Sequence, residues 1–208
     1  KRDIIMNTID TPLITRARLD EAYSYSSYRE LMEDLVDQKS TTGPNKSEDM
    51  AYYTALNHQR MKRLDKTLKI DDDLAARIAA IDHEQTWVVI TESWCGDAAQ
   101  NVPVIEKLAS LNDQIELKLF LRDENLDIMD SYLTNGSRSI PKLVIFKRDN
   151  MKELGTWGPR PAALQEIYDA WRNDPNKVPY KEFNVTIQKW YAKDKAQEMQ
   201  KELMEVFQ

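Results

Sequence analysis

The chain has 208 residues, of which 41% are hydrophobic and 31% are charged, and this composition predicts a soluble globular protein with one packed domain and some decoration. Its formal net charge is −6, and its lysines and arginines are scattered among carboxylates. Because no basic stripe exists that could follow a phosphate backbone, we expect no nucleic-acid partner.

The cysteine and histidine content limits the possible metal and redox chemistry. Cys95 is the only cysteine, and the two histidines, His58 and His83, are well separated from it and from each other. An internal disulfide is therefore impossible, and we predict no metal site.

No stretch of the sequence predicts a membrane span. No apolar run reaches the roughly 18 to 20 residues that a bilayer requires, and residues 1–12 lack the apolar block of a secretory signal. We expect no membrane partner and a cytoplasmic location. The sequence begins at Lys1 rather than Met, so it does not tell whether a leader was removed before Lys1.

Residues 1–82 are predicted to be a helical extension packed on the core. Helical spacing places Tyr25, Tyr28 and Met32 on one face of the first helix, and three consecutive aspartates provide negative charge at the start of the last one. The expected elements are a loose lead-in up to about Asp10 and helices over 14–38, 47–70 and 74–81, with a polar Gly-Pro break at 39–45.

Residues 83–172 are predicted to form an α/β domain with the order strand, helix, strand, helix, strand, strand, helix. The first two strands are expected to be parallel and the last two to form an antiparallel hairpin, which gives one mixed sheet with helices on both faces. The predicted strands cover 87–91, 115–121, 142–147 and 151–156, and the predicted helices cover 97–111, 125–133 and 161–171.

Residues 173–208 are predicted to be a proline-bearing linker followed by one amphipathic helix over 183–207. Docking of this helix on the body of the same molecule is the plainer interpretation. A homodimer or partner surface is the alternative.

Cys95 lies where a predicted strand gives way to a predicted helix. The positive end of the helix dipole and the unpaired amides of its first turn favour a thiolate at such a position. The competing interpretation is that a lone cysteine is a small buried hydrophobe.

Residues 87–171 resemble the thioredoxin-like superfamily, because four landmarks occur in the family's order: Trp94-Cys95-Gly96, Pro103, Ile140-Pro141 and Trp157-Gly158. The resemblance implies a thioredoxin-like fold, with a four-stranded mixed sheet flanked by helices, to which this chain adds the N-terminal helical extension and a C-terminal helix. It also implies a cis bond before Pro141, facing Cys95. The whole set, with its Trp-Cys-Gly-Asp-Ala motif, is similar to a branch of bacterial thioredoxin-like proteins of uncertain function.

The departures from the family pattern concern one half of its mechanism. Ala98 stands where thioredoxins have the resolving cysteine, so no internal thiol can release a mixed disulfide. Val89 stands where they have a buried acid, and Asp97 replaces the proline of the motif, where its charge opposes a thiolate at Cys95. Only the attacking half of the chemistry is retained.

Two functions follow from this pattern, and the sequence leaves open whether there is any enzymatic turnover. The first is a monothiol thioredoxin-like protein in which Cys95 exchanges with a protein or low-molecular-weight disulfide, and an external thiol such as glutathione completes turnover. The second is a redox-inactive binding module that holds an extended peptide or partner at the proline groove. The predicted site comprises Cys95 as catalytic residue, Trp94, Gly96, Asp97 and Ala98 around it, and Ile140, Pro141, Arg138 and Gly158 as substrate-binding residues.

Overall fold

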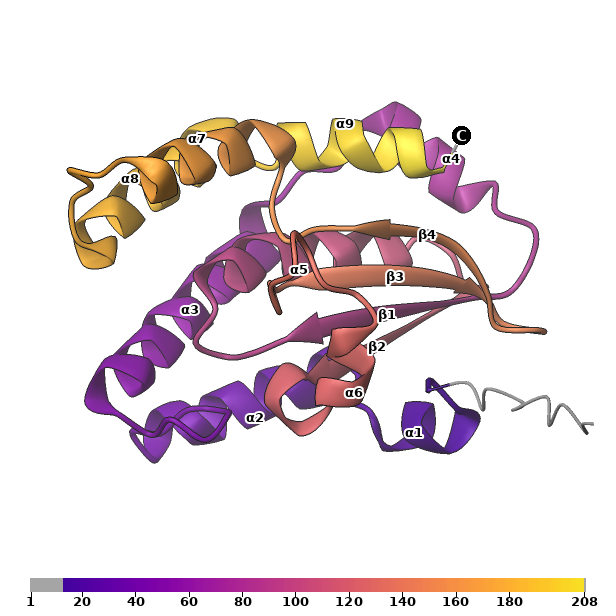
Figure 1. Ribbon diagram of the computed structural model, residues 1–208. Helices are drawn as coiled ribbons and strands as arrows, with labels where there is room; N and C mark the ends of the chain where they lie inside the picture. Colours follow the sequence, from indigo (N-terminus) through magenta and orange to yellow (C-terminus); the bar gives the residue numbers. More distant parts are fainter. Residues whose placement is uncertain (1–12, 208) are drawn as a thin grey trace, which may run out of the picture.

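The computed structural model describes residues 13–207, so the expected lead-in up to about Asp10 lies outside the described residues. A four-stranded mixed sheet with the order β2-β1-β3-β4 occupies the middle of the molecule (Figure 1). β1 is parallel to β2, and β3 is antiparallel to both β1 and β4. The predicted fold class is confirmed. The strands are β1 (Gln85–Thr91), β2 (Ile115–Leu121), β3 (Lys142–Lys147) and β4 (Lys152–Trp157).

The strand sequences reflect their positions in the sheet. Every residue of β1 is buried, because β1 lies between two other strands and helices cover the sheet. That position explains why residues 87–90 of β1 are a continuous apolar run instead of an alternating one. β4 is an edge strand, and its first three residues are exposed.

Among residues 13–207, four helices precede β1 and a fifth follows it directly. Each of the first four begins at an oxygen-bearing side chain that accepts a hydrogen bond from a first-turn amide. These cap residues are Thr15, Ser24, Ser47 and Asp71. The helices are α1 (Arg16–Glu21), α2 (Tyr25–Asp37), α3 (Glu48–Thr67), α4 (Asp72–Ala79) and α5 (Gly96–Ala109).

The single helix predicted over 14–38 is wrong, since the structure has α1 and α2 there. Tyr23 lies between them and pairs with Leu119 of β2 as an isolated antiparallel bridge. Its amide donates to the Leu119 carbonyl at 3.0 Å, and its carbonyl accepts from the Leu119 amide at 2.8 Å. This pairing takes the chain out of the helix, and Ser24 then caps the next one. The break therefore depends on β2, which is remote in sequence.

One short α-helix lies between β2 and β3, and another follows β4. α6 (Leu126–Asp130) is shorter than the predicted helix and ends before the turn in which Thr134 pairs with Ser137. α7 (Ala162–Asn173) begins directly after Pro161, as predicted.

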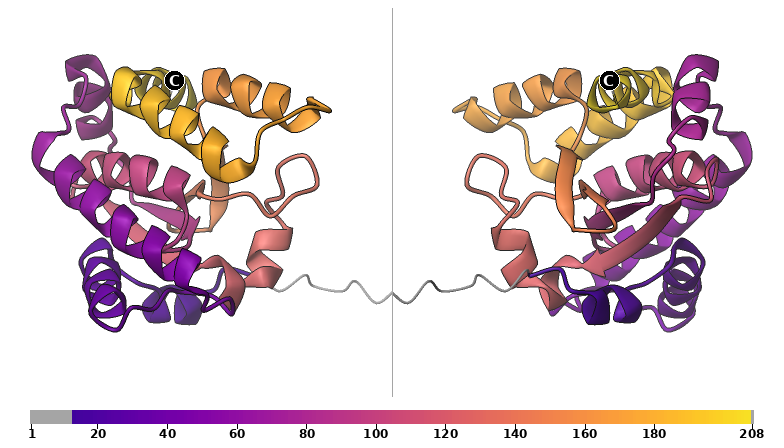
Figure 2. Two further views of the ribbon diagram at one scale, coloured as in Figure 1. Left: turned by 90° about the vertical axis from the view of Figure 1, so that its left-hand side faces the viewer. Right: turned by 90° about the vertical axis from the view of Figure 1, so that its right-hand side faces the viewer.

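The single C-terminal helix predicted over 183–207 is also wrong. The structure has α8 (Tyr180–Asp194) and α9 (Gln197–Val206), and the two residues between them, Lys195 and Ala196, have φ of 56° and 66°. The break lets the two helices pack in different places. α8 packs on α7 in a small core of its own, whereas Met199 and Leu203 of α9 belong to the main core (Figures 1 and 2). One straight helix could not reach both.

Candidate functional site

The Cys95 turn, residues 92–98, connects β1 to α5. Cys95 has φ −79° and ψ 115° and is the N-cap of α5, where its Sγ accepts a hydrogen bond from the Ala98 amide at 3.4 Å. The Cys95 amide donates to the Glu92 carbonyl at 3.1 Å and closes the turn. The position of the resolving cysteine therefore contributes a backbone amide to the sulfur and no second thiol.

The loop before β3 faces this sulfur. The Cys95 thiol donates to the Ile140 carbonyl oxygen, with 3.3 Å between sulfur and oxygen, and the Ile140–Pro141 peptide bond is cis. Cys95 is 8% exposed and Ile140 is 5% exposed, and Pro141 is also buried. The structure thus brings together three of the residues named from the sequence, in a closed arrangement.

Gly158 lies behind Pro141. Its φ is +112°, and a Cβ built on it would lie 2.3 Å from the Pro141 carbonyl oxygen. Only glycine fits this close approach between two backbone segments. Gly158 therefore supports the Pro141 loop by backbone contact.

The environment of Cys95 keeps its thiol protonated. Burial raises the pKa of Cys95 to about 12, and the negative charge of Asp97 acts in the same direction. The Ala98 amide and the Arg160 guanidinium oppose this shift but do not offset it. At neutral pH the group is a neutral hydrogen-bond donor.

Asp97 is the centre of a buried hydrogen-bond network. It is 6% exposed, and its Oδ2 accepts from Arg160 Nε at 3.1 Å and Nη2 at 2.6 Å. Its Oδ1 accepts from the Tyr191 hydroxyl at 2.7 Å, and that hydroxyl accepts from Asn101 Nδ2 at 3.0 Å. Burial, followed by the charge of Asp97, raises the pKa of Tyr191 well above its usual value. Asp97 thus joins α5 to α8 and to the segment before α7.

One face of α8 covers the Cys95 turn. A Cβ built on Gly96 would lie 3.0 Å from Gln188 Nε2 and 4.0 Å from Asn184 Oδ1. Gln188 Oε1 also accepts from Gln100 Nε2 of α5 at 2.8 Å. Asn184, Gln188 and Tyr191 follow one another at intervals of four and three residues, which places them on one side of a helix. They form a polar stripe beside the buried apolar residues of α8, Phe183 and Ile187.

Arg138, which the sequence singled out, is held away from Cys95. Arg138 donates through Nε and Nη2 to both carboxylate oxygens of Asp130, at 2.6 and 2.8 Å, in an exposed ion pair. The cation whose charge acts on the Cys95 thiol is Arg160. The guanidinium of Arg122 lies over the Trp94 ring, 4.8 Å from its centre. Sequence reasoning missed Arg160, which has no local pattern, and Tyr191, which the spacing of the polar stripe could have indicated.

The Cys95 turn is also tied to the N-terminal helices. The Ser93 hydroxyl makes hydrogen bonds with the hydroxyls of Thr42 and Thr54, at 3.0 and 2.9 Å. Asn57 Nδ2 of α3 donates to the Ser93 carbonyl at 2.9 Å. α3 therefore positions one side of the turn and α8 the other.

Glu92 is a buried carboxylate at the start of the same turn. It is 0% exposed, and its Oε1 accepts from the Asp123 amide at 2.8 Å. Its Oε2 has no hydrogen-bond partner among residues 13–207, and burial raises its pKa. No local sequence pattern pointed to this group.

Two features are absent from the part of the chain that the structure describes. Across residues 13–207, no three His, Cys, Asp or Glu side chains are grouped so that they could hold a metal ion. None of the helices in that range has both the length and the apolar character needed to cross a bilayer.

Comparison with known proteins gives one family and several similar folds. A family model described as thioredoxin matches residues 43–172. The fold is similar to a protein of unknown function from Pseudomonas aeruginosa, with a TM-score of 0.60, 16% sequence identity, and coverage of 93% of this chain and 96% of that one. It is also similar to an HIV epitope-scaffold, with a TM-score of 0.51, 17% identity, and coverage of 88% and 97%. No curated protein matches.

Proposed function

This chain belongs to the thioredoxin family, and from that premise we propose that it is a redox-inactive thioredoxin-fold binding module in which Cys95 is a neutral structural thiol. The proposed partner is an extended peptide or another protein chain, which includes a second copy of this one. The proposed location is the cytoplasm.

One observation carries the proposal: the Cys95 thiol donates its proton to the Ile140 carbonyl at 3.3 Å from a buried position. A thiolate has no proton to donate, so ionisation would remove this bond and leave a charge in a buried site. With a pKa of about 12, very few Cys95 thiols are ionised at pH 7. The thiolate is the nucleophile in thiol–disulfide exchange, so this population supports a structural role.

The covering helix gives the module its expected mode of binding. The Ile140 carbonyl is already bonded to Cys95, and α8 lies over the adjoining turn. A peptide that pairs with the backbone of Ile140 would therefore have to displace the α8 contacts first. We expect the Asp97–Tyr191 hydrogen bond to control that step, because it connects the turn directly to α8.

A second function, monothiol exchange with glutathione as the external thiol, is favoured by a different observation. The Ala98 amide points at Sγ from the first turn of α5, and Arg160 places positive charge nearby. Both groups stabilise a thiolate once α8 no longer buries it. This alternative needs an open state, whereas the redox-inactive module does not.

The reactivity of Cys95 decides between the two. We would incubate the native protein with oxidised glutathione at pH 7 and 8 and weigh it by intact-mass spectrometry, with the urea-unfolded protein as reference. The proposal expects an adduct on the unfolded chain and none on the native chain over the same time. The redox-inactive hypothesis is refuted if the native chain gains the glutathione adduct at a rate within tenfold of the rate for the unfolded chain.

The binding half of the proposal needs a separate assay. An array of random extended peptides would be probed with wild type, Cys95→Ser and Tyr191→Phe, and with Tyr52→Phe as a matched change at an exposed tyrosine. We expect binding to survive Cys95→Ser and to strengthen in Tyr191→Phe, because that change removes the hydroxyl that bonds Asp97. Loss of binding in Cys95→Ser, or equal effects of the two tyrosine changes, would contradict the proposal.

A further inference from the structure

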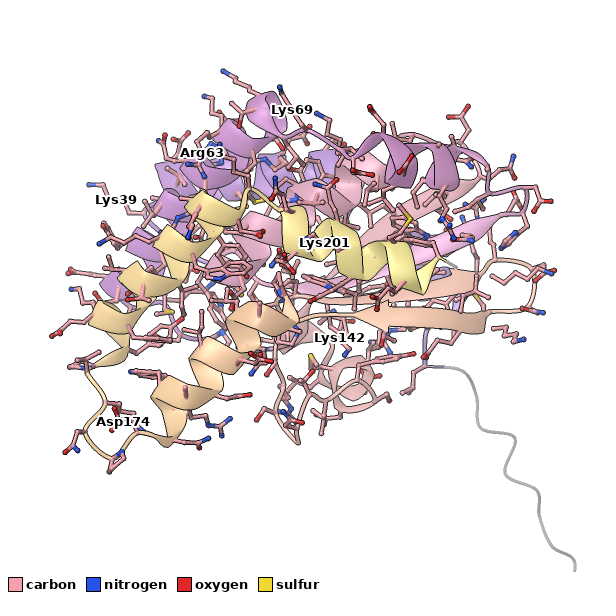
Figure 3. All side chains as sticks on the ribbon, turned by 90° about the horizontal axis from the view of Figure 1, so that it is seen from above. Lys39, Arg63, Lys69, Lys142, Asp174 and Lys201 are labelled. Atoms are coloured by element: carbon pink, nitrogen blue, oxygen red, sulfur yellow. The ribbon has the colours of Figure 1, made fainter. Side chains whose placement is uncertain are left out.

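A cavity of about 600 Å³ opens where the end of α3 meets the junction between α8 and α9. Residues 63, 64 and 67–71 line one wall, and residues 191, 192, 195–197 and 200 line the other, with Gln100 of α5 between them. Figure 3 shows Arg63 and Lys69 on the α3 side, next to the point where α8 gives way to α9. Cys95 does not line this cavity.

The floor of the cavity is buried and fixed by hydrogen bonds. Gln200 Oε1 accepts from the Asp71 amide at 2.7 Å, and its Nε2 donates to the Lys69 carbonyl at 3.2 Å. The Tyr191 hydroxyl is held by Asp97. Leu68 is buried beside them and contributes apolar surface. A ligand would find these walls already in place and would lose little affinity to ordering them.

The mouth of the cavity carries unbalanced positive charge. Arg63, Lys69 and Lys195 line it and are exposed, and none of their side chains forms an ion pair or hydrogen bond with another residue in the range 13–207. The single lining carboxylate, Asp71, is used in the fold, since its Oδ1 accepts from the Asp73 and Leu74 amides that begin α4. Three positively charged side chains therefore line the cavity together with one carboxylate, which is already hydrogen-bonded within the fold.

We propose that this cavity binds a small organic anion with an apolar body. A phosphate or carboxylate head would lie at the mouth, where Arg63, Lys69 and Lys195 offer positive charge. The body would pack on the aliphatic lining, to which Leu64, Leu68, Ile70, Ala192 and Ala196 contribute. The volume lies within the range of small-molecule sites. This inference does not depend on the proposed role of Cys95.

Isothermal titration with octyl phosphate, below its micelle concentration, tests the proposal on the full chain. Inorganic phosphate and 1-octanol are the comparison ligands, each lacking one half of the proposed chemistry. We expect octyl phosphate to bind with a stoichiometry of one and more tightly than either. Arg63→Gln, Lys69→Gln and Lys195→Gln should each weaken binding by about two- to fivefold, as expected for exposed charges, and the triple variant should weaken it further.

Lys152→Gln is the matched control, because Lys152 is an exposed lysine on β4 outside the cavity. Its affinity for octyl phosphate should equal that of wild type. The proposal is overturned if octyl phosphate does not bind one to one, if the triple variant binds like Lys152→Gln, or if 1-octanol binds as tightly as octyl phosphate. Equal binding of inorganic phosphate would overturn the apolar half of the assignment.

Discussion

Replacement of Asp97 by Asn tests whether the buried network holds α8 over the Cys95 turn. Asp97 accepts from Tyr191 on one side and from two nitrogens of Arg160 on the other. The Asp97 side chain is 7% exposed and that of Arg160 is 10% exposed. An Asn side chain has one carbonyl oxygen and cannot accept from both sides. Asp97→Asn therefore leaves either the Tyr191 hydroxyl or the Arg160 charge without its acceptor.

The expected cost follows from the burial of the pair. Removing one partner of a buried ion pair costs about 3–5 kcal/mol, because the remaining charge stays in the interior without compensation. For a chain of this size that corresponds to a fall in Tm of roughly 6–20 °C. Arg160→Gln should cost a similar amount. The double variant should cost much less than the two single costs added together, since neither charge is then stranded.

Urea unfolding followed by tryptophan fluorescence measures these free energies. Asp130→Asn is the matched control, because Asp130 accepts from Arg138 at 2.6 and 2.8 Å in an exposed pair of the same chemistry. That change should have no more effect than an ordinary surface substitution. The reasoning is refuted if Asp97→Asn unfolds at the same urea concentration as Asp130→Asn, or if the Asp97 and Arg160 costs add in the double variant.

Three further predictions rest on other parts of the site. The folded Cys95 thiol, with a pKa of about 12, keeps its proton while the unfolded thiol loses it near 8.5. The stability of wild type relative to Cys95→Ser should therefore fall by roughly 1.6 kcal/mol between pH 8.5 and 10, with a slope that approaches about 1.4 kcal/mol per pH unit at the upper end, measured by urea unfolding at each pH. Parallel curves would contradict that assignment. Gly158→Ala should lower the unfolding free energy by roughly 3 kcal/mol or more, because its Cβ would collide with the Pro141 carbonyl. Gly136→Ala is the control, since Gly136 also has a positive φ but open space around it, and this change should cost about 1 kcal/mol. Equal losses in thermal melts would rule out the collision. Burial raises the pKa of Glu92, so the folded state loses stability as the pH rises above the unfolded pKa of about 4.3. Glu92→Gln should therefore gain stability relative to wild type from pH 4 to pH 7 in chemical denaturation. A stability difference that stays constant over this range would contradict the prediction.

The sheet could be predicted from the sequence because its signals are local. The bounds of β2 and β3 agree with the predicted ranges 115–121 and 142–147. Alternating and continuous apolar runs have the periods of exposed and buried strands, and polar turns separate them. The order of these strands and helices then leaves few topologies for a mixed sheet.

The two helix breaks could not be predicted in the same way. At Tyr23 the chain leaves the helix to pair with Leu119, and at Lys195 and Ala196 it turns so that α8 and α9 can reach different cores. Neither place has a proline or glycine to end a helix. Contacts between residues remote in sequence outweigh helical propensity at both.

The sequence by itself determined the position of the only thiol, at the junction of a strand and a helix, and the loss of a resolving thiol at Ala98. Both follow from residue identity and local order. The tertiary structure decided the surroundings of that thiol, because α8 lies over the neighbouring Gly96 and the charge of Arg160 acts on Cys95 from a position 65 residues further along the chain. Burial and the charge of Asp97 raise the pKa of Cys95 to about 12, and its thiol donates to the Ile140 carbonyl. A pKa depends on the groups that surround a side chain in space, and Ile140 and Arg160 are remote from Cys95 in sequence.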